Sequence, residues 1–258
     1  MLRHLAIVLL ILPALNSIAG TFDQRADSAY NAEQYPDAIN LYLEAIKTDG
    51  TSSTLYYNLG NAYYRNGDIA KAIISYERAL RLNPTNGDAK ANLEFVNSKI
   101  VDKKGETGTF FSNLMDSLSG IAHSNTWAWI ALVFFVITIA AAALYMFTSA
   151  IMLRKVGFFG GIVSLLITVI TIILSICAKN IAQNKESAVV TAPSTILSTS
   201  PRTPKNRTEE AMLLHEGTKV QILDSVSAKV DSVAVMWYDV QVDNNHRAWI
   251  KSSDVEII

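Results

Sequence analysis

The 258-residue sequence contains a single cysteine, Cys177, and only four histidines. One thiol cannot form an intramolecular disulfide, and the histidines are scattered without the spacing of a metal-binding motif. The sequence also lacks a glycine-rich phosphate-binding loop, an HExxH zinc motif and a nucleophile motif near a histidine. We therefore expect no disulfide framework, no metal, no cofactor and no enzymatic activity.

Charged side chains are scarce as well, because they make up 17% of the chain where about 25% is usual for globular domains. The formal net charge is −1, so no overall field attracts nucleic acid, and we expect no nucleic-acid partner. Apolar residues account for 50% of the chain. This composition indicates segments almost free of charge, as in membrane spans, and the length indicates more than one domain.

Residues 1–19 have the plan of a signal peptide. Arg3 and His4 precede an apolar run over residues 5–15, and the small residues Ser17 and Ala19 follow it. The run is too short to cross a hydrocarbon core of about 30 Å as a helix. We predict cleavage after Ala19, with an uncleaved anchor as the alternative.

Two later stretches are apolar and long enough to cross a membrane. Over residues 117–178 the only charged side chains are Arg154 and Lys155. We predict a hairpin of two transmembrane helices at 127–148 and 158–178, with its turn around this basic pair. The signal peptide exports the flanking regions and the positive-inside rule keeps the pair cytoplasmic, so both flanking regions would face the periplasm. The reversed orientation is the alternative.

An amphipathic segment at 109–122 precedes the first span. Its apolar residues recur at helical spacing, with serine, asparagine and aspartate between them. We predict a juxtamembrane helix that lies along the membrane surface, with packing on the preceding domain as the alternative.

The region after the signal peptide repeats with a period of 34 residues, which is typical of helix–turn–helix repeats. A shift of this length superimposes alanines and tyrosines: Ala38 on Ala72, Tyr42 on Tyr76, and Ala45 on Ala79. With these positions, the pattern resembles a tetratricopeptide repeat through Leu59, Gly60, Tyr63, Gly67 and Pro84. The resemblance implies a repeat domain at 20–104, with repeats at about 19–52 and 53–86 and a capping helix at 88–99.

Such arrays generally bind extended peptides on the surface formed by the first helix of each repeat. The candidate groove residues on that surface are Tyr57, Asn58, Asn61, Tyr64, Arg65 and Asn92. Asn61 and Asn92 resemble two members of the carboxylate clamp of chaperone-binding repeat proteins, although Tyr57 stands where that clamp has a lysine. Asparagine bonds backbone groups of any peptide, and a solvated polar face is the alternative.

The C-terminal region, 186–258, contains short alternating runs that predict strands. The runs are Thr218–Leu223, Val233–Val242 and Arg247–Lys251, with a hairpin turn at Asp243–Asn245. These runs and the preceding Leu214–Val220 resemble a bacterial SH3-like (SH3b) domain. The resemblance implies a small β-barrel anchored by Trp237, Tyr238 and Trp249.

The expected fold class is therefore multidomain α plus β: tetratricopeptide repeats, a two-helix transmembrane hairpin and a C-terminal SH3-like barrel. This order of parts resembles the BatE-type proteins of the bacterial Bat (aerotolerance operon) family. The resemblance implies a bacterial inner-membrane protein, beside von Willebrand A-domain proteins and a MoxR-type ATPase, linked to aerotolerance or stress. We expect a membrane-tethered scaffold whose repeats bind a protein segment and whose barrel binds a second partner. A peptidoglycan-binding module presented from the inner membrane is the alternative.

Overall fold

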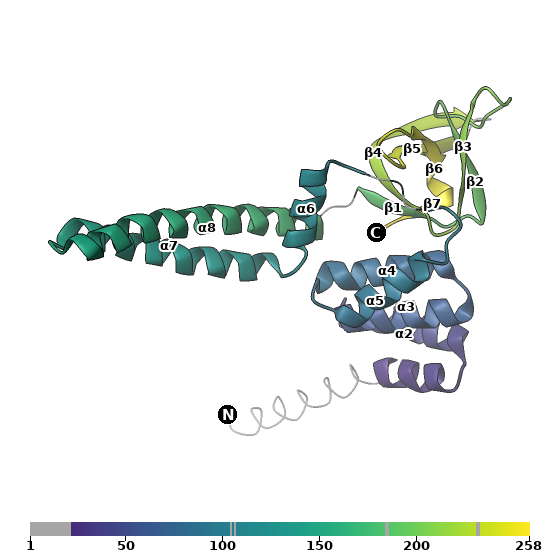
Figure 1. Cartoon of the computed structure of the whole chain (residues 1–258). Helices are drawn as coiled ribbons and strands as arrows, with labels where there is room; N and C mark the ends of the chain where they lie inside the picture. The colour runs from purple at the N-terminus through teal and green to yellow at the C-terminus, as the bar shows by residue number, and fades with distance from the viewer. Residues whose placement is uncertain (1–21, 104, 106, 184–185, 231–232) are drawn as a thin grey trace, which may run out of the picture. The chain divides into compact units, whose positions relative to one another are not determined.

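A computed structural model of the chain describes residues 22–103, 105, 107–183, 186–230 and 233–258. The signal peptide predicted at 1–19 lies outside these residues. The chain divides into two compact units, Met1–Thr107 with Lys185–Ile258, and Gly108–Asn184. We call them the repeat–sheet unit and the helical-pair unit and describe each by itself (Figure 1).

The N-terminal part of the repeat–sheet unit is helical. A helix over residues 22–31 is followed by α2 (Tyr35–Asp49), α3 (Ser53–Asn66), α4 (Ile69–Leu82) and α5 (Gly87–Asn97). The helix over 22–31 and α2 form the first repeat, α3 and α4 form the second, and α5 lies where the sequence predicts a capping helix. Side-chain oxygens fix two helix starts, because Ser52 accepts a bond from the Leu55 amide and Asn86 accepts one from the Ala89 amide.

The repeats pack closely because small residues face aromatic ones. A Cβ atom at Gly60 would lie 2.6 Å from the Tyr76 ring, so only glycine allows α3 and α4 to approach this closely. Ala72 and Ala79 are fully buried beside them. The small and aromatic positions of the repeat pattern therefore have a direct steric role.

The C-terminal part of the unit is a seven-stranded antiparallel sheet with the order β3-β2-β6-β5-β4-β1-β7. The strands are β1 (Ser187–Val190), β2 (Ser194–Ser198), β3 (Glu210–His215), β4 (Lys219–Val230), β5 (Val233–Gln241), β6 (Arg247–Lys251) and β7 (Val255–Ile257), with a 3-10 turn at Ser252–Asp254. The turn expected between β5 and β6 is present, since the Asp243 carboxylate accepts bonds from the Asn245 and His246 amides.

The three predicted anchor residues do not share one core. Tyr238 packs against the main apolar cluster of the sheet, which includes Val240 and Ile250. Trp237 is 1% exposed but points to the opposite face, because successive side chains of a strand alternate. Trp249, which pairs with Asp239 on that opposite face, is only partly buried.

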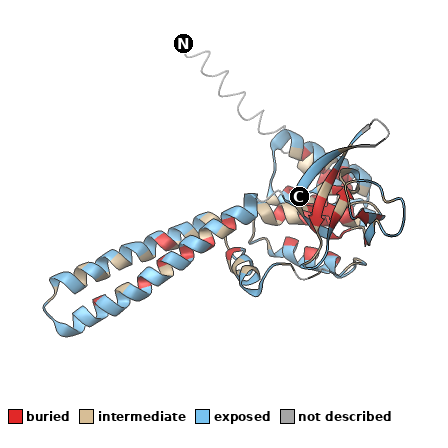
Figure 2. Ribbon diagram, turned by 90° about the horizontal axis from the view of Figure 1, so that it is seen from above, coloured by how far each residue is buried: buried red, intermediate tan, exposed pale blue. Residues whose placement is uncertain are grey.

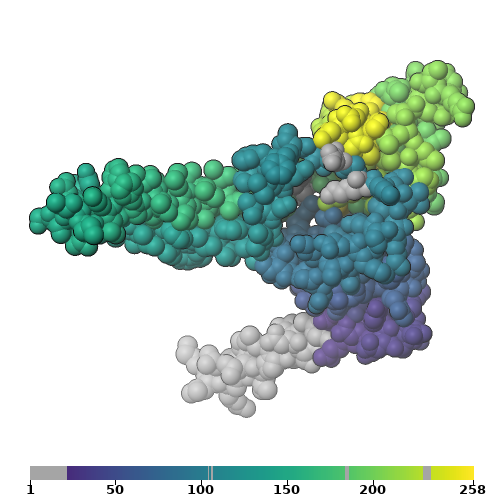
Figure 3. Space-filling model, viewed as in Figure 1, coloured from purple at the N-terminus to yellow at the C-terminus, as the bar shows by residue number. Residues whose placement is uncertain are grey.

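The sheet packs against the outer side of α4. Val189 and Ile258 join the apolar core of the repeats. Ion pairs join Arg78 to Glu256 at 2.9 Å and Lys219 to Glu77 at 2.7 Å. The space-filling view shows the repeats and the sheet as one continuous body (Figure 3).

The helical-pair unit consists of α6 (Phe110–Ser119), α7 (Ser124–Phe147) and α8 (Ile151–Gln183). By length and composition, α7 and α8 are long and apolar enough to span a membrane. The chain reverses over residues 148–150. Arg154 and Lys155 therefore lie within α8, and the prediction that they form the turn is wrong. A short connection suffices between antiparallel helices, and the Arg154 guanidinium lies 5.3 Å from the Tyr145 ring centre, where a cation is favourable.

Polar and small residues line the contact between α7 and α8. Ser164 Oγ donates a hydrogen bond to the Phe134 carbonyl oxygen at 2.7 Å, and Ser175 Oγ donates one to the Ser124 carbonyl oxygen at 3.0 Å. A Cβ atom at Gly157 would lie 2.8 Å from the Ala141 carbonyl oxygen. Most leucine, isoleucine and phenylalanine side chains of both helices instead face outward and are exposed (Figure 2).

Candidate protein-binding site

The candidate site is the inner face of the repeats, formed by the helix over 22–31, α3 and α5. Aromatic side chains run along this face. Tyr64 and Phe95 stack edge to face with ring centres 5.8 Å apart, and the Lys99 ammonium lies 4.4 Å from the centre of the Phe95 ring. Such partly exposed rings provide contact area for a bound segment at low cost in side-chain entropy.

Beneath this face, one oxygen atom in the second repeat accepts two hydrogen bonds and so joins three helices. We call such a set of two bonds a rung. Asn61 Oδ1 accepts a bond from the Tyr76 hydroxyl at 2.7 Å and another from Asn92 Nδ2 at 2.8 Å. Tyr76 belongs to the same repeat and Asn92 to the following helix. Burial is the main cause that raises the pKa of Tyr76, so its hydroxyl remains a neutral donor.

An equivalent rung lies 34 residues earlier, in the first repeat. We call the two rungs together the ladder. There Asp27 Oδ1 accepts bonds from the Tyr42 hydroxyl and, at 3.4 Å, from Asn58 Nδ2. Burial, followed by the bond to Asp27, raises the pKa of Tyr42. Each rung therefore joins the two helices of one repeat to the first helix of the next.

Four of the six predicted groove residues form hydrogen bonds within the repeats. Asn58, Asn61 and Asn92 form hydrogen bonds with groups on other helices, and these bonds help to set the spacing of the repeats. Arg65 is also engaged, because its Nε and Nη2 atoms donate to the Tyr35 hydroxyl at 3.0 and 2.9 Å. Of the six candidates, Tyr57 and Tyr64 remain as partly exposed aromatic surface.

A hollow of about 150 Å³ opens on this face next to the first rung of the ladder. It is lined by Asp27, Tyr30, Asn31, Tyr42, Asn58 and Asn61. Asp27, Tyr30 and Asn31 are absent from the residues predicted from sequence. The signal that could have found Asp27 is its alignment with Asn61 at the 34-residue period.

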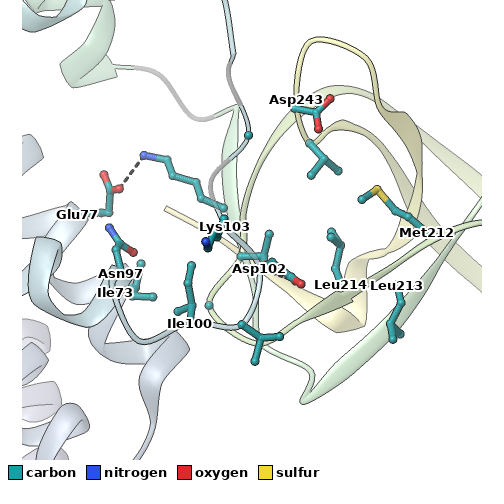
Figure 4. Close-up of a pocket in the computed structure, with 16 residues that line it drawn as sticks. Ile73, Glu77, Asn97, Ile100, Asp102, Lys103, Met212, Leu213, Leu214 and Asp243 are labelled. Atoms are coloured by element: carbon teal, nitrogen blue, oxygen red, sulfur yellow. Dashed lines mark hydrogen bonds and ion pairs between the residues drawn. The ribbon is translucent and has the colours of Figure 1, made fainter.

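A second cavity, of about 380 Å³, lies between the repeats and the sheet (Figure 4). Its apolar wall includes Ile73, Ile100 and Leu214. At its edge the Asp102 carboxylate accepts bonds from the His215 amide, from the Thr218 hydroxyl and at 2.9 Å from His215 Nδ1. Burial pushes the pKa of Asp102 upward, but these bonds outweigh it and hold the pKa below its ordinary value. The bonds of Asp102 and the ion pair between Glu77 and Lys219 therefore join the repeats to the sheet beside this cavity.

Comparison with known proteins finds similarity in the helical repeats. A tetratricopeptide repeat family model matches residues 24–87. The chain contains a tetratricopeptide repeat domain. The corresponding part of the sequence resemblance is therefore confirmed, and such repeats indicate a role in protein–protein interaction. The photosystem I assembly protein Ycf3 of Rippkaea orientalis (strain PCC 8801 / RF-1) is a distant relative. It is 32% identical to this chain over 107 residues, which are 40% of this chain and 62% of that protein. The chain thus spans less than two thirds of that relative's length.

Proposed function

We propose that the protein is a membrane-tethered scaffold whose tetratricopeptide repeats bind a segment of a partner protein. The position of the sheet carries this proposal. Among the described residues of the repeat–sheet unit, hydrogen bonds and ion pairs between repeats and sheet fall on α4 and on Asp102. The sheet therefore covers the outer side of the repeats and leaves the inner face with its aromatic residues open.

A second part of the proposal concerns the membrane and the protein complex in which the scaffold works. We propose a Bat-type complex of a bacterial inner membrane, with von Willebrand A-domain proteins and a MoxR-type ATPase as partners and a role in aerotolerance or stress. The order of the parts in the sequence supports it. The relative's name describes an assembly protein, which accords with a scaffold, and the proposal gives this chain no catalytic step.

In this proposal α7 and α8 cross the membrane and α6 lies along its surface. Exposed aromatic side chains support the placement of α6, because Phe110 is 85% and Phe111 is 67% exposed. Alkaline phosphatase fused after residue 107 and after residue 258 tests the orientation. Both fusions are expected to be active if the two flanking regions face the periplasm, and two inactive fusions would establish the reversed orientation.

Co-purification tests the groove. The full chain would be solubilised from native membranes with a mild detergent, and its partners identified by mass spectrometry. Tyr64→Ala removes an aromatic group from the inner face and is expected to lower partner recovery severalfold. Leu43→Ala, on α2 and 43% exposed, is the matched control and should leave recovery unchanged. Equal recovery with both variants would remove the groove from the proposal.

The sheet would hold a second partner, for which we propose a protein. Its partly exposed Trp249 also offers a surface on which a sugar ring could stack, which favours peptidoglycan as the second candidate. Sedimentation of the purified full chain with isolated cell-wall sacculi separates the two. A protein scaffold stays in the supernatant, whereas a cell-wall module sediments and loses this property in Trp249→Ala.

A further inference from the structure

We infer that the hollow at Asp27 receives the lysine or arginine side chain of a bound protein segment, so that the partner's segment is basic. The inference rests on the proposed function and adds the chemistry of the partner. It starts from a difference between two equivalent rungs of the ladder, one built on an aspartate and the other on an asparagine.

An amide is sufficient to build the rung. In the second repeat a single oxygen atom, Asn61 Oδ1, accepts both ladder bonds. In the first repeat both bonds again fall on a single oxygen, Asp27 Oδ1. Among the described residues, no donor is bonded to the other carboxylate oxygen, Oδ2, and no cationic side chain pairs with Asp27. The carboxylate therefore supplies a charge and an acceptor that the ladder does not use.

The surroundings make this charge more attractive to a cation. Asp23 lies one turn earlier on the same helix, and its pKa is raised by burial and then by the negative charges of Asp27 and Asp49. Residues 22–52 contain six acidic and two basic side chains, a net charge of −4. Residues 53–86 contain two acidic and four basic side chains, a net charge of +2. Four of the six residues that line the hollow belong to this acidic half of the repeats.

The wall of the hollow suits the head group of a basic side chain. Tyr30 and Asn31 line the hollow. An aromatic ring can bind a cation through its face, and an amide oxygen is a further acceptor. A lysine or arginine that reaches Asp27 Oδ2 would form a charge-assisted hydrogen bond, which is stronger than a bond between neutral groups. An acidic or C-terminal group would instead meet the negative charges of Asp23 and Asp27.

Photocrosslinking in native membranes tests this chemistry with the full chain. Gln24 is exposed, lies one turn before Asp27 on the same helix and does not line the hollow. It would be replaced by p-benzoyl-phenylalanine, and the crosslinked partner peptides would be sequenced by mass spectrometry. We expect these peptides to contain a lysine or arginine within a few residues of the crosslink. Asp27→Asn should lower the crosslink yield roughly fivefold, as expected for the loss of one partly exposed ion pair.

The matched control is Asp37→Asn, which removes the same charge from an exposed position in the first turn of α2. It should leave the yield unchanged. Asp27→Asn should fold normally because Asn61 already forms the same rung, and unaltered protection of the repeats against protease verifies this. An unchanged yield in Asp27→Asn, an equal loss in Asp37→Asn, or peptides without basic residues would overturn the inference alone. If no partner peptide crosslinks even when Asp27 and Asp37 are both intact, both the inference and the proposed function are overturned.

Discussion

The two units of this chain place polar and apolar side chains in opposite ways. In the repeat–sheet unit the buried residues are mostly alanine, valine, isoleucine, leucine and tyrosine, and the buried carboxylate of Asp239 is paired with Arg247. Between α7 and α8 the buried positions include Ser164, Thr168 and Thr171, while long aliphatic side chains face outward. Figure 2 shows the contrast, since buried residues are concentrated in the repeats and the sheet.

The difference accords with the proposal that α7 and α8 lie in a membrane and the repeat–sheet unit lies in water. Water drives apolar groups together, whereas lipid gives aliphatic side chains no reason to pack on one another, so small and polar residues mediate helix contacts there. The hydroxyl groups of α8 are all bonded within the pair: Thr168 and Thr171 donate to carbonyl oxygens of their own helix, and Ser164 and Ser175 donate to α7. This arrangement is what a hydrocarbon environment requires.

The largest effect is expected in the water-exposed unit. Tyr76→Ala would leave a cavity beside Gly60 and remove a rung of the ladder, which should cost about 3–5 kcal/mol of the free energy of unfolding. Tyr76→Phe removes only the hydroxyl and should cost about 1 kcal/mol. Hydrogen exchange of the α3 and α4 amides at increasing urea concentration measures both. Equal losses in the two variants would mean that the ladder, rather than the buried ring, holds the repeats together.

Replacing an outward-facing residue in the middle of α8 by lysine tests whether lipid or water surrounds this helix. Leu166 is 58% exposed, and Leu166→Lys should oppose membrane insertion by about 3 kcal/mol. The measurement is the fraction of the chain that resists extraction with alkaline carbonate. Phe95→Lys, at a residue that is 50% exposed in the repeat–sheet unit, should not change this fraction. If Leu166→Lys leaves the fraction unchanged, the outward side chains of α8 do not contact lipid.

The smallest effect concerns the polar contact inside the pair. Ser164→Ala removes the bond to the Phe134 carbonyl oxygen and should weaken the association of α7 with α8 by about 0.6 kcal/mol. Thr138→Ala is the matched control, because Thr138 Oγ1 donates to the same carbonyl oxygen from within α7 at 2.9 Å. Unfolding in bicelles by titration with sodium dodecyl sulfate compares the two variants. A larger loss for Thr138→Ala would show that the contact between the helices contributes nothing beyond local helix stability.

Features that depend on local periodicity could be predicted from the sequence. The 34-residue period located both repeats, and the capping helix expected at 88–99 corresponds to α5 at Gly87–Asn97. The spans expected at 127–148 and 158–178 lie within or close to α7 and α8. Alternating runs located strands β4, β5 and β6. In each case the spacing of side chains along the chain determines which of them share a face.

Features that depend on distant partners could not be predicted. Asn61 resembles a ligand-binding residue in sequence, and only the fold brings Tyr76 and Asn92 to its oxygen. The charge of Arg154 suggested a turn, whereas in the structure the Tyr145 ring accommodates it within a helix. The packing of Val189 and Ile258 into the repeat core joins segments that more than a hundred residues separate. The contacts of Arg154, Val189 and Ile258 leave no periodic pattern in the sequence, and the 34-residue period aligns Asn61 with Asp27 without showing which groups bond to them.

The contribution of Val189 and Ile258 to the repeat core has a consequence for biogenesis. The ribosome completes the repeats before it makes α7 and α8, and it makes β1 and β7 only afterwards. The repeats must therefore wait, with part of their apolar surface uncovered, until the helical pair has been synthesised and the last strand has emerged. A chaperone that shields α4 during this interval would find a surface there that the mature protein no longer offers.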